Sequence, residues 1–266
     1  MIQVKNITKT YGNKKVVDNV SLSIQEGKIT SFIGPNGAGK STLLSIMSRL
    51  LKRDSGEVLV DGKDILKWDN KELAKKIAIL RQSNNINIRL TIRELVSFGR
   101  FPHSQGNLKE EDYKYIDEAI NYMQLKEFED RYLDELSGGQ RQRAYIAMVI
   151  AQNSDYIFLD EPLNNLDIKH SVEMMKVLQN LVKELNKTVV IVMHDINFAS
   201  CYSDNIVVMK NGKVVRASEK ECVINKEFLE EIYEIDFDIR DIGGNKICIY
   251  HCNNKCKKCN KNECLA

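Results

Sequence analysis

Residues 34–42 form a glycine-rich loop with the spacing of a phosphate-binding site. The loop consists of Gly34, Pro35, Asn36, Gly37, Ala38, Gly39, Lys40, Ser41 and Thr42. Its glycines let the backbone wrap an anion, and the N–H groups of the loop and of the following helix then face the phosphates. Lys40 is expected to reach the β- and γ-phosphates, and the Ser41 hydroxyl to ligate Mg²⁺. The loop predicts binding of a nucleoside triphosphate.

Two adjacent carboxylates, Asp160 and Glu161, follow the apolar run 156–159. Asp160 suits a position on or next to Mg²⁺. Glu161 is the candidate base that polarises an attacking water. Standing alone, such a pair would usually be an acidic turn that caps a strand, but the phosphate-binding loop upstream favours hydrolysis.

His194 and Gln82 also follow apolar runs, namely 189–193 and 77–80. A lone histidine is usually a hydrogen-bonded structural residue. Because His194 follows a predicted strand in a chain that also has the phosphate-binding loop and the paired carboxylates, it is expected to contact the γ-phosphate and to hold Glu161 and the water in line. Spacing alone supports Gln82 least, because a glutamine at a strand end is often a surface amide.

The elements that must position these residues are short buried strands. The runs 77–80, 156–159 and 189–193 are continuously apolar, and 29–33 is apolar apart from Thr30 and Ser31, which is typical of parallel strands covered on both faces. Ligand sites in such sheets lie at the carboxyl ends of the strands, where all the candidate residues stand. Asp61-Gly62 and Asn211-Gly212 predict two tight hairpins.

Helical periodicity occurs between the strands. Two faces are predicted to be apolar, Tyr113, Ile116, Ile120 and Met123 on one helix and Leu178, Leu181, Val182 and Leu185 on another. The block from about 84 to 152 has helical segments and no convincing strand, so we expect it to be a helical insertion in the sheet domain.

Composition narrows the class of protein. The chain has 266 residues, 43% of them apolar, and its 39 basic and 37 acidic side chains nearly balance, which argues against nucleic acid as the partner. The longest apolar run, 144–151, is far shorter than the roughly 20 residues that span a bilayer. The first residues lead directly into a predicted strand, without the apolar segment of a signal peptide. We expect a cytosolic protein that reaches a membrane only through partners.

Leu136-Ser137-Gly138-Gly139-Gln140 matches the signature of ATP-binding cassette (ABC) ATPases. The other motifs stand in that family's order: Tyr11, the loop 34–42, Gln82, the signature, Asp160-Glu161, Asn165-Leu166-Asp167 and His194. The resemblance covers residues 1 to about 250. It implies an α/β fold with a RecA-like parallel-sheet core, an N-terminal antiparallel β subdomain and an inserted helical subdomain that carries the signature.

The resemblance also implies roles. Tyr11 would stack on adenine, and Gln82 would sense Mg²⁺ or the water and relay to a membrane partner. Ser137, Gly138, Gly139 and Gln140 open a helix whose N-terminus suits an anion, yet the chain's own phosphates belong to the loop 34–42. In this family the signature, together with Asp167, acts on the nucleotide held by the partner, in a head-to-tail homodimer. Asn164-Asn165 departs from the serine usual there, which leaves the contacts of that loop open.

Three segments, 90–103, 163–170 and 194–202, look like those of ferric-siderophore import ATPases. This likeness implies two membrane permease subunits, an extracytoplasmic substrate-binding protein, and a peripheral place on the cytoplasmic face of the membrane. The imported compound is expected to be a ferric siderophore or a related iron compound. Segment 98–103 is predicted to dock a permease, and the alternative for it is a loop with a surface aromatic. The alternative is a soluble ABC ATPase without a transport role, for example in iron–sulfur cluster assembly.

Residues 251–266 form a polar, cysteine-rich segment that we expect to be a mobile tail. Together with Cys248, its cysteines crowd into the last 19 positions, and a reducing cytosol argues against disulfides. Cys252, Cys256, Cys259 and Cys264 are candidate ligands for zinc or an iron–sulfur cluster. The alternative is a dispensable tail, and the family resemblance supports neither.

Overall fold

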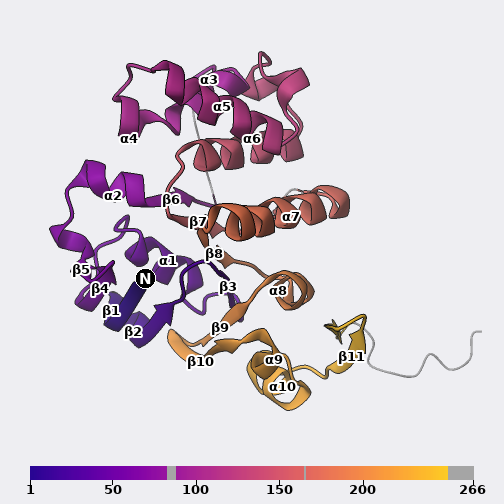
Figure 1. The fold of residues 1–266 in the computed structure, drawn as a ribbon. Helices are drawn as coiled ribbons and strands as arrows, with labels where there is room; N and C mark the ends of the chain where they lie inside the picture. The colour runs from indigo at the N-terminus through magenta and orange to yellow at the C-terminus, as the bar shows by residue number, and fades with distance from the viewer. Residues whose placement is uncertain (83–87, 165, 251–266) are drawn as a thin grey trace, which may run out of the picture.

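The fold is built around a six-stranded sheet (Figure 1). The computed structural model describes residues 1–82, 88–164 and 166–250. The sheet order is β10-β9-β3-β8-β7-β6, in which β10 alone runs antiparallel to its neighbour. Its strands are β3 (Ile29–Ile33), β6 (Ile77–Leu80), β7 (Tyr156–Asp160), β8 (Thr188–Val192), β9 (Asn205–Lys210) and β10 (Lys213–Glu219). Every residue of β3, β7 and β8 is buried, which confirms the prediction from continuous apolar runs.

A second, antiparallel sheet contains the N-terminus. It has the order β2-β1-β4-β5 and consists of β1 (Ile2–Tyr11), β2 (Lys14–Ile24), β4 (Ser55–Val60) and β5 (Lys63–Asp64). Both predicted hairpins are present, because Asp61-Gly62 joins β4 to β5 and Asn211-Gly212 joins β9 to β10. All four turn residues have positive φ, as tight hairpin turns of this kind require.

Helices cover the sheets and fill the block between β6 and β7. The α-helices are α1 (Lys40–Met47), α2 (Asn70–Lys76), α3 (Ile92–Phe98), α4 (Phe101–Ser104), α5 (Glu110–Tyr122), α6 (Gly138–Ala151), α7 (Ile168–Leu185), α8 (Ile196–Tyr202), α9 (Lys220–Val223) and α10 (Lys226–Tyr233), of which α3 to α6 lie between β6 and β7 in the chain. A small hairpin of β11 (Asp238–Ile242) and β12 (Asn245–Ile249) follows. Helices α3 to α6 lie together at the top of Figure 1. The bounds of the ATPase domain, 1–250, and of its helical insertion, 84–152, stay predictions. Within the described ranges, no helix is both long and apolar enough to cross a membrane.

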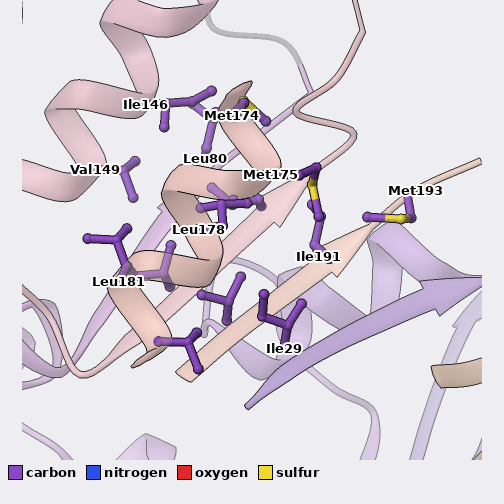
Figure 2. Close-up of a cluster of buried hydrophobic side chains, with 14 of the residues drawn as sticks. Ile29, Leu80, Ile146, Val149, Met174, Met175, Leu178, Leu181, Ile191 and Met193 are labelled. Carbon is purple, nitrogen blue, oxygen red and sulfur yellow. The ribbon is translucent and has the colours of Figure 1, made fainter. Parts of the chain in front are cut away.

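The larger core lies where α6 and α7 meet the central sheet. Figure 2 shows side chains of α6 and α7 packed over those of β3, β6 and β8, among them Ile146, Val149, Met174, Leu178, Leu80, Ile29 and Ile191. Two residues expected on apolar faces are nearly half exposed, Tyr113 at 46% and Leu185 at 49%. Tyr113 lies in the first turn of α5 and Leu185 ends α7, so both project past the neighbouring elements that cover the middle of each helix.

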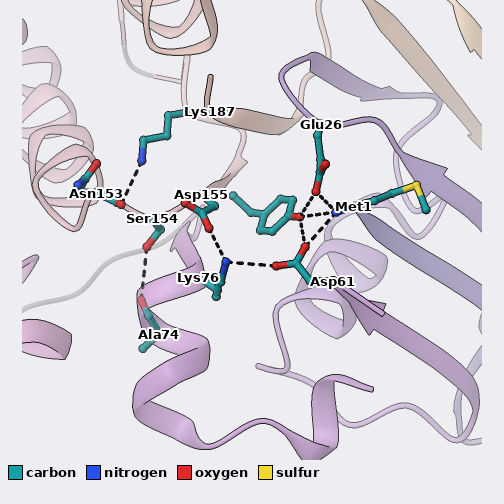
Figure 3. Close-up of polar contacts among 10 residues, drawn as sticks. Met1, Glu26, Asp61, Ala74, Lys76, Asn153, Ser154, Asp155 and Lys187 are labelled. Atoms are coloured by element: carbon teal, nitrogen blue, oxygen red, sulfur yellow. Dashed lines mark hydrogen bonds and ion pairs between the residues drawn. The ribbon is translucent and has the colours of Figure 1, made fainter. Parts of the chain in front are cut away.

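A polar network ties elements together at the start of β7 (Figure 3). Lys76 at the end of α2 pairs with Asp155 at 2.7 Å and with Asp61 at 3.3 Å. The Met1 ammonium group contacts Asp61 and Glu26. Strand starts lie at the opposite edge of a parallel sheet from the carboxyl ends, so this network supports the fold and leaves the candidate site free.

Candidate functional site

The loop 34–42 connects β3 to α1, which begins at Lys40 as predicted. Gly34 has φ 136°, and a Cβ there would lie 2.0 Å from the Met209 carbonyl oxygen, so only glycine fits. The Lys40 ammonium donates to the carbonyl oxygens of Gly34 at 2.7 Å and of Pro35 at 3.0 Å. The start of the loop is therefore bonded to the Lys40 side chain at its end.

The loop borders an open cavity of about 540 Å³. The lining residues are Val16, Asn36, Gly37, Ala38, Gly39, Lys40, Ser41, Thr42, Gln82, Glu161, Asn164 and His194. Five separate segments of the chain contribute to this wall. Gln82, Glu161 and His194 were predicted from strand ends, and the fold brings them together with the loop.

The Glu161 carboxylate is the centre of a hydrogen-bond cluster. One oxygen lies 2.5 Å from Nε2 of His194, and the other accepts from Gln82 Nε2 at 2.6 Å and from Asn164 Nδ2 at 2.7 Å. Only 10% of the side chain is exposed. A carboxylate held by three side chains from different segments has its orientation fixed.

The backbone of Glu161 adopts an unusual conformation. Its φ is 51°, a left-handed value that is uncommon for a residue with a side chain. Its N–H donates to the Val192 carbonyl oxygen at 3.0 Å and so keeps the residue against β8. Such conformations persist where the surrounding structure imposes them, often at functional sites.

Asp160 and Ser41 form the part of the site that suits a cation. The Ser41 hydroxyl donates to Asp160 Oδ1 at 2.7 Å, and burial raises the pKa of Asp160 above its usual range. Burial likewise lowers the pKa of Lys40, against the opposing effect of Glu161 and Asp160. Hydroxyl and carboxylate oxygens are the ligands that Mg²⁺ prefers, and a buried carboxylate gains from a nearby cation. The residues present therefore fit Mg²⁺.

The signature lies apart from this cavity in the same chain. Ser137 caps α6, which begins at Gly138, because its Oγ accepts from Gln140 N while the Gln140 side chain accepts from Ser137 N. Ser137 and Gly138 are exposed, so the helix N-terminus faces outwards. None of Ser137, Gly138, Gly139 or Gln140 lines the cavity.

Two further predicted residues also stand outside the cavity wall. Asp167 caps α7, and its Oδ1 accepts from the backbone N–H of His170 at 2.8 Å and lies 2.8 Å from His170 Nδ1. Tyr11 ends β1 with about half of its surface exposed, and the Lys9 ammonium lies 5.5 Å from the centre of its ring. Asn165 lies outside the described residues.

Sequence reasoning missed two cavity residues. Asn164 follows Glu161 by three positions, and an amide so close to a candidate base was a readable signal for a hydrogen bond. Val16 lies on β2, where nothing nearby in the sequence indicates a binding role. Its carbonyl oxygen would lie 2.4 Å from a Cβ on Gly39, so it approaches the loop from a separate sheet.

Cys248 does not belong with the cysteines of the tail. It is 3% exposed in β12, where burial raises the pKa of its thiol to about 11. Cys248 is not one of the four candidate ligands of the tail, and the structure places it in the larger hydrophobic core. Cys252, Cys256, Cys259 and Cys264 lie outside the described residues, and the described part of the chain contains no group of three or more His, Cys, Asp or Glu side chains placed to hold a metal ion.

Comparisons with known proteins agree with this geometry. The family described as "ABC transporter" matches residues 17–164. The petrobactin import ATP-binding protein YclP of Bacillus subtilis (strain 168) is 63% identical over 250 residues, which cover 94% of this chain and 99% of that protein. The petrobactin import ATP-binding protein FatE of Bacillus anthracis is 47% identical over 94% of this chain and 100% of its own.

Among solved structures, the dimeric structure of MJ0796, a bacterial ABC transporter cassette, superposes with a TM-score of 0.75 at 37% identity. The match covers 83% of this chain and 99% of that one. The expected α/β fold, with its antiparallel subdomain and parallel-sheet core, is thus confirmed. The chain belongs to the ABC transporter family, and it carries the family's ATP-binding domain.

Proposed function

We propose that this chain is the ATP-hydrolysing subunit that powers import of a ferric siderophore across a membrane. The observation that carries the proposal is the match to YclP, a petrobactin import ATP-binding protein, over nearly the whole of both chains. Petrobactin is therefore the first substrate to test. The soluble ABC ATPase of iron–sulfur assembly is not favoured, because both relatives above are named for import.

The residues around the cavity have different roles in ATP hydrolysis. Lys40 and the N–H groups of its loop bind the phosphates, and Ser41, Asp160 and Gln82 hold Mg²⁺. When bound, Mg²⁺ supplies positive charge that offsets the charge on the phosphates. Glu161 accepts the proton of the attacking water.

His194 and Tyr11 complete the proposed site. His194 lies against Glu161, so it can orient that carboxylate and contact the γ-phosphate. Tyr11 stacks on the adenine with its exposed ring face. It is not part of the cavity wall, so its contact with ATP depends on where the base lies.

The signature acts on the nucleotide of a second copy. Ser137, Gly138, Gly139 and Gln140 present an exposed helix N-terminus, which attracts anions, and no residue of this set lines the chain's own cavity. A head-to-tail dimer with two-fold symmetry places each signature over the partner's phosphates. Asp167 lies on the loop that crosses this interface.

A groove of about 530 Å³ between α2, α4 and the end of α6 is the proposed permease contact. Phe98 and Phe101, which line it, are 49% and 58% exposed. The buried ion pair of Arg100 with Asp112, at 2.8 Å, holds the backbone between them. Through this contact the chain sits peripherally on the cytoplasmic face of the membrane, and the permeases receive substrate from an extracytoplasmic binding protein.

Co-expression with the permease subunits tests the transport role. We expect the chain to co-purify with them from membranes and its ATPase rate to rise when ferric petrobactin and its binding protein are added. Phe101→Asp should abolish co-purification, because a charge would be buried in the contact. Tyr113→Asp changes another exposed aromatic, on α5 and outside the groove, and should leave co-purification intact. Co-purification without any response to ferric siderophores would contradict the import of these substrates.

The cysteine tail is a separate hypothesis. We propose that Cys252, Cys256, Cys259 and Cys264 bind zinc or an iron–sulfur cluster, on the strength of their spacing alone. Protein purified anaerobically is then expected to contain metal that is lost when residues 252–266 are deleted. Elemental analysis and the absorbance spectrum measure this, and equal metal content in the two forms would reject the hypothesis.

A further inference from the structure

We propose that Asn197 is a positioning residue for His194, and that it acts by fastening α8 to the C-terminal hairpin of β11 and β12. The inference rests on the role proposed above for His194. Apart from His194, the residues it concerns do not line the wall of the nucleotide cavity.

Helix α8 is poorly suited to fix its own position. It has only seven residues, and helices this short are not stable without tertiary contacts. His194 stands two residues before it, and Asp195 between them caps the helix by accepting from the N–H groups of Asn197 and Phe198. Any shift of α8 is therefore passed directly to His194.

Side chains of α8 form hydrogen bonds with the backbone of β12. The Asn197 side chain donates to the Cys248 carbonyl oxygen at 3.1 Å and accepts from the Cys248 N–H at 2.7 Å. One helical turn further on, the Ser200 hydroxyl donates to the Lys246 carbonyl oxygen at 2.6 Å. Asn197 thus bonds to β12 as a neighbouring strand would.

The hairpin is itself anchored to elements other than α8. The Lys246 ammonium donates to the carbonyl oxygens of Glu221 at 2.8 Å and Ile224 at 2.9 Å, next to α9. Cys248 is buried in the larger core. The hairpin can therefore act as a fixed support for α8, rather than an appendage that follows it.

The contact between His194 and Glu161, which this support holds in place, is sensitive to small displacements. His194 Nε2 lies 2.5 Å from Glu161 Oε1, and a displacement of about 1 Å in a catalytic group can cost up to ~10²-fold in rate. Losing the Asn197 side chain also leaves the N–H and carbonyl of Cys248 without these partners in a partly buried place. We expect α8 and His194 to shift in response.

The test compares Asn197→Ala with a matched control in the full-length chain. Asn225→Ala also removes an asparagine of the C-terminal region, one that caps α10 and whose side chain hydrogen-bonds to the backbone of Cys222 and Phe228 rather than to β12. We expect Asn197→Ala to lower kcat about tenfold with little change in the KM for ATP, and Asn225→Ala to leave both near wild type. Ser200→Ala, the milder change, should have a smaller effect in the same direction.

Two further measurements separate positioning from general destabilisation. Asn197→Ala should cost no further activity in a His194→Ala background, because its effect passes through that ring. It should also change the ¹⁵N chemical shifts of the His194 ring, which Asn225→Ala should not, and this reading needs no turnover. Full activity in His194→Ala would overturn the proposed role of His194. Additive losses in the double variant, or unchanged ring shifts, would overturn the role of Asn197 alone.

Discussion

Replacing Glu161 with glutamine is expected to slow ATP hydrolysis by roughly 10²–10⁴-fold while ATP still binds, because a general base contributes about that much. The variant keeps the shape of the side chain and an oxygen that can accept from His194 or from Gln82 and Asn164. It cannot accept a proton from water. Two variant chains should then close on ATP and stay closed, so a stable ATP-dependent dimer should appear by light scattering.

Glu57→Gln is the matched control for this experiment. Glu57 is exposed on β4, away from the cavity, so the same chemical change should leave hydrolysis and dimerisation as in the wild type. Normal turnover in Glu161→Gln would mean that another group activates the water. Loss of ATP binding would mean that Glu161 acts on the nucleotide itself.

The sequence predicted those parts of the site that depend on local patterns. Strands β3, β7 and β8 are buried on both faces, so apolar residues predominate in them, with Thr30 and Ser31 as buried polar exceptions in β3, and the polar residue that follows β7 or β8 stands near the strand end. Glu161 and His194 were found in this way. The loop 34–42 was found because a backbone that wraps an anion needs glycine at set positions, as the 2.0 Å approach at Gly34 illustrates.

These local patterns could not predict contacts between segments that are far apart in the sequence. Val16 reaches Gly39 from another sheet, and Asn197 bonds to Cys248, which is 51 residues further along the chain. Such pairs depend on how whole helices and strands pack against one another. The periodicity of one element does not indicate which other element it contacts.

The placement of the signature follows from helix electrostatics. Gly138 begins α6, and the residue before it caps the helix, so the free N–H groups of the first turn point out of the molecule. The chain's own phosphate-binding loop belongs to a different cavity. An exposed anion site without an anion in its own chain is explained if the anion comes with a second copy.

Mixing two inactive variants is expected to restore hydrolysis if the signature acts on the partner's nucleotide. Lys40→Ala removes the phosphate-binding lysine, and Gly138→Asp places a negative charge at the signature. The fold should tolerate both, because alanine favours helices and Gly138 is exposed at a helix start, where aspartate is favourable. Half of the dimers in an equal mixture pair unlike chains, and each of these has one intact site, so about a quarter of wild-type activity should return. Steady-state phosphate release measures it.

The double variant Lys40→Ala/Gly138→Asp, mixed equally with wild type, gives the discriminating control. If sites are shared, every dimer of unlike chains has two damaged sites, and activity per total chain falls to about a quarter of wild type. If each chain uses its own signature, every wild-type chain stays active and about half remains. This second mixture gives an answer even when one intact site cannot turn over alone, because dimers of two wild-type chains supply all of its activity in the shared arrangement. Activity of about one half here, together with none in the first mixture, would assign the signature to its own chain's nucleotide.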